Sequence, residues 1–356
     1  MHRLSHLKKM VFRGFWDELT SPIIGLAPMD GVTDAPFRYM VAKKGKPSLI
    51  ITEFTNVEGL ARGAIKMLDQ LRFDKIERPI VAQVYGVEKD SYYKVALIIC
   101  YLGFDGIDIN MGCPMHKIAE RGSGAGLIDT PDLAKELIRT VQKATGDWKN
   151  GITLEEAEIR PKIITALKKM QSKEAPRRLL PVSVKTRIGT QTNTSEEWTK
   201  HLLEAKPANI TMHGRTLKQL YRGNADWETI AKAAEIAKGS GTSFLGNGDI
   251  SSYDDAKKKI EDYKIDGVLV GRATFGNPWF FANSPPSISD RIETAIEHSQ
   301  KFEEIFSDRK FFPMRKHLAW YIKGFDGAKE VRTKLMKTES SEDVLQILNA
   351  KLSPST

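Results

Sequence analysis

Short apolar runs alternate with stretches of helical spacing from residue 21 to residue 282. The eight runs expected to be strands are Pro22–Met29, Leu49–Phe54, Ile80–Tyr85, Gly106–Asn110, Pro181–Arg187, Asn209–His213, Ser243–Asn247 and Gly267–Gly271. The helical stretches between them are Pro36–Lys44, Val57–Leu68, Lys89–Leu102, Pro131–Thr145, Ser195–Ala205, Trp227–Lys238 and Tyr253–Tyr263. This alternation predicts an α/β fold with parallel strands. Eight units favour a closed (β/α)8 TIM barrel, and the alternative is an open doubly wound sheet.

One long insertion interrupts the alternation between residues 146 and 180. Within it, residues 160–178 carry seven basic side chains against a single acid, Glu174. A helix is expected around Ile163–Met170. The simplest interpretation is a solvated, basic elaboration of the surface.

The pattern becomes purely helical after Asn283-Ser284-Pro285-Pro286, which is typical of a linker. Helices are expected from Ser289 to about Leu348, with an N-cap at Ser287 or Ser289. Residues 309–337 carry nine basic and two acidic side chains, and most of their aromatic residues are expected in the core. We therefore predict a barrel domain at 21–284 and a small all-α domain at 285–356. Residues 1–20 are predicted to be an N-terminal extension with a short helix around Phe15–Leu19.

Composition narrows the class of protein further. The formal net charge is +9 and the pI is near 9.3, which weakly favours a polyanionic partner. Two cysteines, Cys100 and Cys113, cannot form a disulfide scaffold or a four-ligand metal site alone, so no metal is expected. There is no signal-peptide core and no apolar run of membrane-spanning length. We expect a cytoplasmic protein without a membrane partner.

Polar side chains stand at the end of nearly every predicted strand, where TIM barrels place their chemistry. Such groups are costly to bury unpaired, so together they predict a functional site. In chain order the strand ends carry Pro28, Met29 and Asp30, then Glu53, Gln83, Asn110 and Cys113, then Lys185, Arg187, His213 and Arg215, then Asn247, Asp249 and Arg272.

The last two strand ends predict a phosphate site. Barrels commonly bind phosphate there through backbone N–H groups and a helix N-terminus. Gly246, Gly248 and Gly271 allow the backbone to approach closely, and Arg272 adds a charged contact. The alternative is that these glycines merely turn the chain.

A phosphate anchor beside amide, lysine and histidine side chains suits flavin mononucleotide (FMN). The Gln83 amide can donate to and accept from the flavin pyrimidine edge. Lys185 would place positive charge near flavin N1–O2. His213 would hydrogen-bond the ring or the phosphate. Taken alone, Lys185 is more often a surface lysine and His213 a structural histidine.

Cys113 lies in a Gly-Cys-Pro turn directly after the fourth predicted strand. An ordinary thiol has a pKa of roughly 8.5, so it is mainly protonated at neutral pH and can supply a proton. The alternative is a small buried hydrophobe. Cys100 falls within a helical pattern and is expected to be structural.

These motifs resemble the tRNA dihydrouridine synthases. The matching segments run in family order, and the cysteine motif is highly specific. They are Ala27-Pro28-Met29-Asp30-Gly31-Val32-Thr33-Asp34, Gly106–Pro114 followed by Lys117, Val184–Gly189, Met212–Thr216, Gly246–Ile250, Gly271-Arg272-Ala273 and Met314-Arg315-Lys316-His317. The resemblance covers about Ile23 to Arg332.

The resemblance implies an FMN-dependent, bacterial-type enzyme that reduces uridine in tRNA, mainly in the D-loop, and uses NADPH or NADH as reductant. Flavin N5 would pass a hydride to uracil C6, and the Cys113 thiol would protonate C5. It assigns to flavin binding Pro28, Met29, Asp30, Gln83, Lys185, His213, Asn247, Gly248, Asp249, Gly271 and Arg272. It assigns to substrate binding Asn110, Arg187, Lys117, Arg215, Arg315 and Lys316. The insertion is longer than the corresponding family loop, and is either an RNA contact or a neutral decoration.

Two other functions stay open at this point. One is a flavin barrel that acts on a free pyrimidine or another small molecule, which would not need the basic C-terminal domain. The other is a non-catalytic RNA-binding barrel, against which the intact Cys113, Lys185 and phosphate loop argue. A monomer is the default expectation.

Overall fold

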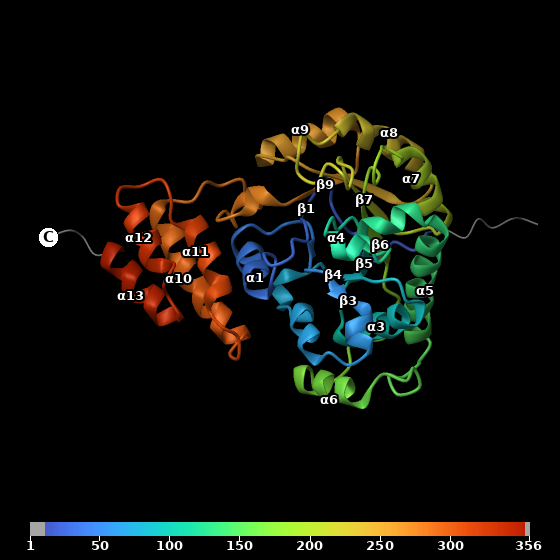
Figure 1. Cartoon of the computed structure of the whole chain (residues 1–356), viewed down its shortest axis with the longest axis horizontal. Helices are drawn as coiled ribbons and strands as arrows, with labels where there is room; N and C mark the ends of the chain where they lie inside the picture. The colour runs from blue at the N-terminus through green and yellow to red at the C-terminus, as the bar shows by residue number, and fades with distance from the viewer. Residues whose placement is uncertain (1–10, 353–356) are drawn as a thin grey trace, which may run out of the picture.

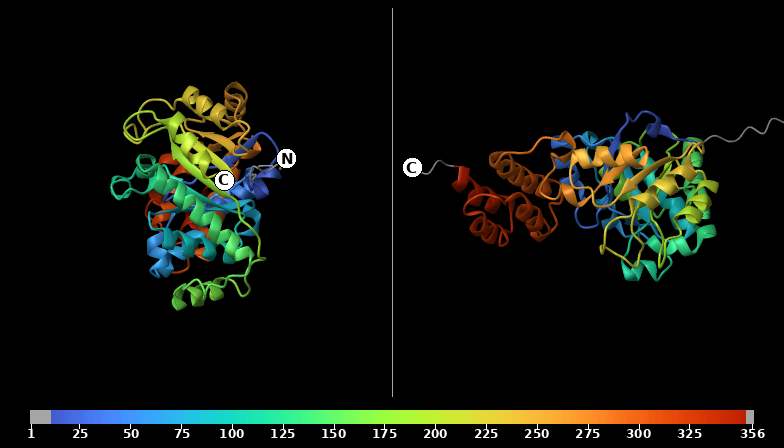
Figure 2. Two further views of the ribbon diagram at one scale, coloured as in Figure 1. Left: turned by 90° about the vertical axis from the view of Figure 1, so that its right-hand side faces the viewer. Right: turned by 90° about the horizontal axis from the view of Figure 1, so that it is seen from above.

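The computed structural model describes residues 11–352, apart from the side chains of residues 116, 117 and 350–352. A barrel forms one body, and a group of C-terminal helices lies against one side of it (Figure 1). The same arrangement is seen from two further directions in Figure 2. Within the described residues, each helix is too short or too polar to cross a bilayer.

The barrel is a closed, entirely parallel sheet, as predicted. Its strands are β1 (Ile23–Leu26), β2 (Ile50–Ile51), β3 (Thr55–Asn56), β4 (Ile80–Tyr85), β5 (Gly106–Met111), β6 (Val182–Arg187), β7 (Asn209–His213), β8 (Ser243–Asn247) and β9 (Gly267–Val270). The order is β2-β1-β9-β8-β7-β6-β5-β4-β3, and β2 also pairs with β4, which closes the ring.

The second predicted strand differs from the expectation, because β2 and β3 together fill its place beside β4. Between them the Thr52 hydroxyl accepts a hydrogen bond from the backbone N–H of Gln83 at 3.0 Å. The Glu53 carboxylate accepts from the N–H of Gly31 at 2.6 Å. These side-chain bonds replace ladder bonds, so the strand is interrupted at Thr52–Phe54.

Seven helices cover the barrel: α1 (Ala35–Lys44), α2 (Val57–Ala61), α3 (Lys89–Leu102), α5 (Pro131–Lys149), α7 (Ser195–Glu204), α8 (Trp227–Ala237) and α9 (Tyr253–Tyr263). The helix expected at 57–68 is shorter, and a 3₁₀ segment, η2 (Ile65–Leu71), follows it. Gly63 has a φ of +94°, which a continuing helix does not allow. Helix α5 runs to Lys149, so the insertion begins four residues later than expected.

The insertion contains the expected helix, α6 (Pro161–Met170). Ile163, Ile164 and Leu167 are buried against the protein, whereas Lys162, Lys168 and Lys169 are exposed. Farther along, the Arg177 guanidinium lies 4.2 Å from the Trp148 ring centre, which fixes the return to the barrel.

Before β1, the expected short helix is a 3₁₀ turn, η1 (Gly14–Asp17). Its Trp16 is buried in a cluster with Ile23, Leu49, Val81 and other strand residues. The turn therefore packs beneath the end of the barrel at which the strands begin. Residues 1–10 of the predicted extension lie outside the described part of the chain.

The C-terminal helices are α10 (Ile288–Ile305), α11 (Arg315–Tyr321), α12 (Ala328–Leu335) and α13 (Ser341–Leu352). Ser287 caps α10, and the Asp290 carboxylate accepts from the Ser287 backbone N–H, which completes a capping box. Phe311 and Tyr321 are buried as expected, but Phe312 is 62% exposed. Trp320 is half-buried and stacks at 4.2 Å on Phe275, which follows the last barrel strand.

The helical body packs tightly on α1 of the barrel. The Phe37 ring of α1 lies 5.2 Å from the ring of His317 and 6.0 Å from that of His298. Lys43 and Lys44 both pair with Glu297 of α10. Burial lowers the pKa of His298 to about 3, so this imidazole is neutral at physiological pH.

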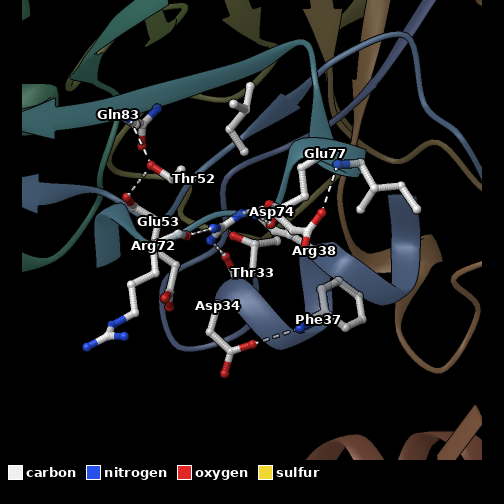
Figure 3. A network of polar contacts seen from close by, with 12 residues as sticks. Thr33, Asp34, Phe37, Arg38, Thr52, Glu53, Arg72, Asp74, Glu77 and Gln83 are labelled. Carbon is white, nitrogen blue, oxygen red and sulfur yellow. Dashed lines mark hydrogen bonds and ion pairs between the residues drawn. The ribbon is translucent and has the colours of Figure 1, made fainter. Parts of the chain in front are cut away.

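A buried ion pair ties α1 to the loop before β4 (Figure 3). The Arg38 guanidinium donates to the Glu77 carboxylate at 2.7 Å and to the Thr33 carbonyl at 2.8 Å. Both charged side chains are almost fully excluded from solvent, at 0% and 1% exposed. The pair fixes the loop that follows β1, which forms part of the site described below.

Replacing Arg38 with methionine is expected to destabilise the protein by about 3–5 kcal/mol, because it leaves the Glu77 carboxylate buried without its charged partner. Urea unfolding monitored by circular dichroism measures this loss. Replacing both residues, as Arg38→Met with Glu77→Met, should recover part of it. A loss below about 1 kcal/mol in the single variant would show that the pair is not a structural link.

Candidate active site

The barrel strands bring the predicted site residues into neighbouring register positions. Gln83 of β4 pairs with Asp108 of β5, and Asn110 of β5 pairs with Lys185 of β6. Farther round the ring, Arg187 pairs with His213, and His213 pairs with Asn247. Residues two apart on a strand face the same side, so these side chains converge at the ends of the strands.

A buried chain of hydrogen bonds runs across β4, β5 and β6. The Ser183 hydroxyl donates to one Asp108 oxygen at 2.6 Å, and the Gln83 amide donates to the other at 2.8 Å. The Asn110 amide then donates to Gln83 Oε1 at 2.9 Å. Burial raises the pKa of Asp108 to about 6. Sequence reasoning did not single out Asp108 and Ser183, although a polar residue inside an apolar run is the signal for such a network.

The same network orients the cysteine. Asn110 Oδ1 accepts from the backbone N–H groups of Gly112 and Cys113, at 3.0 and 2.8 Å. The Cys113 side chain is buried, with 7% of its surface exposed. Burial raises the pKa of the Cys113 thiol, an effect that the charge of Asp30 reinforces and the positive charges of Arg187 and Lys185 oppose. The thiol is therefore protonated at neutral pH and suited to donate a proton.

The raised thiol pKa can be measured directly by alkylation in a Cys100→Ala background. We expect the reaction of Cys113 with iodoacetamide to accelerate only as pH rises above about 8.5, because the thiolate is the reactive form. The sign follows from the shift, since a raised pKa extends the protonated form to higher pH. A midpoint below pH 8 would contradict this assignment.

Lys185 lies in the middle of the site, half-buried at the rim of β6. Burial and the neighbouring Arg187 lower the pKa of its ammonium group to about 8. Among residues 11–352, no side chain or carbonyl accepts a hydrogen bond from Lys185 Nζ. A partly buried cation without an acceptor is expected to bind an anionic or carbonyl group of a ligand.

Arg187 holds two loops of the site together. Its Nε donates to the Gly112 carbonyl at 2.7 Å, and one terminal nitrogen lies 3.2 Å from the Thr216 carbonyl. The side chain is almost fully buried. Its predicted contact with the substrate would therefore come from the remaining N–H groups of the guanidinium.

Residues at the ends of β7, β8 and β9 form the candidate phosphate site. Asp249 accepts from Arg215 at 2.5 Å and from Arg272 at 2.7 Å, and so holds both guanidinium groups at this corner. Gly248 has a φ of +127°, and a Cβ there would lie 2.6 Å from Ala225 Cβ and 3.0 Å from His213 Cδ2. Only glycine fits this turn. Burial and nearby cations lower the pKa of His213 well below its usual value, so its ring is neutral.

The loop after β1 forms the opposite wall. Met29 approaches the candidate phosphate corner, since its Sδ would lie 3.3 Å from a Cβ placed on Gly271. Thr33 holds the loop by accepting from the Met29 N–H at 2.9 Å. Pro28 and the exposed Asp30 flank Met29 on this loop.

The residues predicted to contact RNA do not lie together on one surface. Arg215 is 2% exposed and lies inside the phosphate corner. Arg315 donates to the Thr338 carbonyl at 2.8 Å within the helical body. Lys316 faces the barrel, with its Nζ 3.5 Å from a Cβ placed on Gly31, so it bridges the two bodies. Lys117 belongs to the short helix α4 (His116–Ala119), and its side chain lies outside the described part of the chain.

The site fits FMN. It offers an unpaired ammonium group at Lys185 for the ring, the second N–H of the Gln83 amide beside it, and two arginines with a glycine turn for a phosphate. Over the described residues, no group of three or more histidine, cysteine or acidic side chains is placed to hold a metal ion.

The sequence of this chain is similar to those of known proteins of one family. The family model for dihydrouridine synthase (Dus) matches residues 25–155 and 154–355. A probable tRNA-dihydrouridine synthase 2 of Bacillus subtilis (strain 168) is 33% identical over 344 residues, which cover 94% of this chain and 95% of the relative. A probable tRNA-dihydrouridine synthase of Staphylococcus aureus (strain COL) is also 33% identical over 344 residues, with 94% of each chain covered. Among solved structures, DHODH from Eimeria tenella in complex with ferulenol aligns with a TM-score of 0.48 at 13% identity, over 73% of this chain and 78% of that chain.

Proposed function

This chain belongs to the dihydrouridine synthase family, and we propose that it reduces the C5=C6 bond of a uridine in tRNA to give 5,6-dihydrouridine. The observation that carries the proposal is the pairing of a protonated, oriented thiol with an unpartnered ammonium group on adjacent strands. Asn110, which pairs with Lys185 across β5 and β6, also anchors the Cys113 backbone. The relatives' names supply tRNA as the substrate.

FMN would be held by Gln83 and Lys185 at its ring and by the corner of His213, Asn247, Gly248, Asp249, Gly271 and Arg272 at its phosphate, with Pro28, Met29 and Asp30 along the ring. When bound, FMN supplies a hydride to uracil C6 and is reduced again by a nicotinamide cofactor, for which the resemblance favours NADPH. Lys185 would stabilise negative charge at the flavin N1–O2 edge, because its ammonium group has no competing acceptor among the described residues.

The Cys113 thiol would donate a proton to uracil C5 as the double bond is reduced. Burial keeps the thiol protonated, and the bonds that Asn110 Oδ1 accepts fix the backbone that carries it. The second N–H of the Asn110 amide remains available for a uracil carbonyl. An Arg187 N–H group that donates to no carbonyl would bind the same ring from β6.

Access of the uridine requires the base to leave its stack, because a base inside folded RNA cannot reach the barrel mouth. Loops present a splayed base at moderate cost, and the D-loop is the site that the resemblance favours. The exposed basic residues of the helical body, including Lys310, Lys323, Lys329 and Lys334, would bind the RNA backbone. We further propose that the protein acts as a monomer in the cytoplasm.

The experiment that tests this function is the formation of dihydrouridine in tRNA incubated with the purified protein and NADPH. We expect the purified protein to be yellow and to release FMN on denaturation. A protein that takes up no flavin would exclude the proposed reaction.

A further inference from the structure

A cavity lies beside the proposed active site, at the seam between the barrel and the helical body. Its volume is about 290 Å³, just below the ~300–1,000 Å³ typical of small-molecule sites. Its walls come from the loop after β1, from β3, η2, β4 and the segment after Cys113, and from Arg309 before α11. We call it the seam cavity. It shares only Asp30 with the proposed flavin site.

The seam cavity is next to the catalytic thiol. Met115, which lines it, follows Cys113 by two residues and is 50% exposed. Tyr85, another lining residue, is close enough to Cys113 for a thiolate there to raise the pKa of the Tyr85 hydroxyl. A group bound in the cavity would therefore lie within reach of a uracil positioned at Cys113.

The lining is suited to a nucleobase. Phe54 and Tyr85 are both half-buried, and their rings meet edge to face at 4.8 Å, so each presents aromatic surface. Met67 and Met115 add polarisable side chains. Among the described residues, no hydrogen-bond partner is seen for the Gln70 amide or the Tyr85 hydroxyl. Both are available for the edge of a base.

Two cations at the lining are suited to a phosphate. Lys66 is exposed, and no ion pair of its ammonium group occurs within residues 11–352. Arg309 is held by Asp69 at 3.0 Å and lies 4.0 Å from the Phe306 ring centre. Asp30 is the acidic side chain of the lining, and its carboxylate would accept from an N–H of a base rather than face a phosphate.

From these observations, and resting on the proposed function, we propose that the seam cavity binds the nucleotide adjacent to the target uridine. The neighbouring nucleotide stays covalently attached to the target, so it must lie one backbone step from Cys113 once the target base is turned out. Stacking on Phe54 and Tyr85 would hold the adjacent base apart from the RNA stack and stabilise the splayed conformation.

The first test uses substitutions that either fill the cavity or remove an aromatic side chain from its lining. Gln70→Trp should fill it, and Phe54→Ala should remove a stacking surface. Each should raise KM for tRNA about tenfold or more. FMN content and the rate of flavin reduction by NADPH should match the wild type, because the flavin site lies elsewhere. Lys66→Ala should also raise KM, whereas Lys232→Ala, an exposed lysine on α8, is the matched control and should not.

The second test is a double-mutant cycle on RNA whose target uridine has first been mapped. An abasic residue placed next to the target should weaken reduction by the wild-type enzyme. In Gln70→Trp, the same abasic residue should cause little further loss, because the contact is already absent. Two results would overturn the cavity proposal and leave the proposed function intact. One is that the losses from the abasic residue and from Gln70→Trp add fully, whichever neighbour of the target is abasic. The other is a wild-type KM for tRNA in Gln70→Trp and Phe54→Ala. A wild-type enzyme that forms no dihydrouridine would instead overturn the proposed function.

Discussion

Replacing Cys113 with alanine is expected to slow tRNA reduction by about 10²–10⁴-fold, the usual contribution of a positioned general acid. The physical reason is that the Cys113 thiol is both protonated and held in place at the site. Its backbone N–H is held by Asn110 at 2.8 Å, and burial keeps the sulfur protonated. Alanine keeps the backbone bond and removes only the proton.

Stopped-flow oxidation of the reduced enzyme by tRNA measures this loss. FMN content, tRNA affinity and the rate of reduction by NADPH should remain at wild-type values, so the defect would be confined to the second half-reaction. Cys100→Ala is the matched control, because Cys100 is buried in α3 away from the site. Wild-type rates in Cys113→Ala would refute the acid role.

Replacing Lys185 with methionine is expected to lower the rate of tRNA reduction by about 10²–10³-fold, the usual effect of losing one preorganised electrostatic contact. Methionine keeps most of the volume of the side chain and removes the charge. The flavin reduction potential should also become more negative, because the anionic reduced ring loses its nearest cation. Arg187 cannot substitute, since its bonds to the carbonyls of Gly112 and Thr216 fix the position of its guanidinium group.

Redox titration of the purified variant gives the potential independently of catalysis. Lys185→Arg should restore part of the potential, and Lys232→Met should leave it unchanged because Lys232 is exposed on α8. A potential equal to that of the wild type in Lys185→Met would place the lysine away from the flavin ring.

Periodicity alone predicted most of the barrel. The apolar run Ile80–Tyr85 and the helix Lys89–Leu102 were predicted with their observed bounds. These elements are continuous, and their local pattern agrees with their burial. The break at Thr52–Phe54 was not predictable, because it depends on side-chain bonds to Gly31 and to Gln83, which are distant in sequence.

The location of the site could be predicted from the polar residues at the strand ends. The hydrogen-bond and ion-pair partners of those residues could not. Asn110 and Lys185 were expected at the same rim, and the register between β5 and β6 places them side by side. Nothing local indicates that Asp249 engages both Arg215 and Arg272, or that Lys316 faces Gly31. Such pairs depend on how the barrel loops pack against one another and how the helical body packs against the barrel. The individual roles of these residues stay predictions that the variants above address.

We propose that this chain reduces uridine in tRNA by way of a flavin and the Cys113 thiol. The most direct measurement is mass-spectrometric quantification of dihydrouridine in tRNA from cells that lack this modification, after anaerobic incubation with the purified enzyme and NADPH. We predict that dihydrouridine appears at defined positions with the wild-type enzyme and is nearly absent with Cys113→Ala. Unmodified tRNA after incubation with a flavin-loaded enzyme that NADPH reduces would contradict the account.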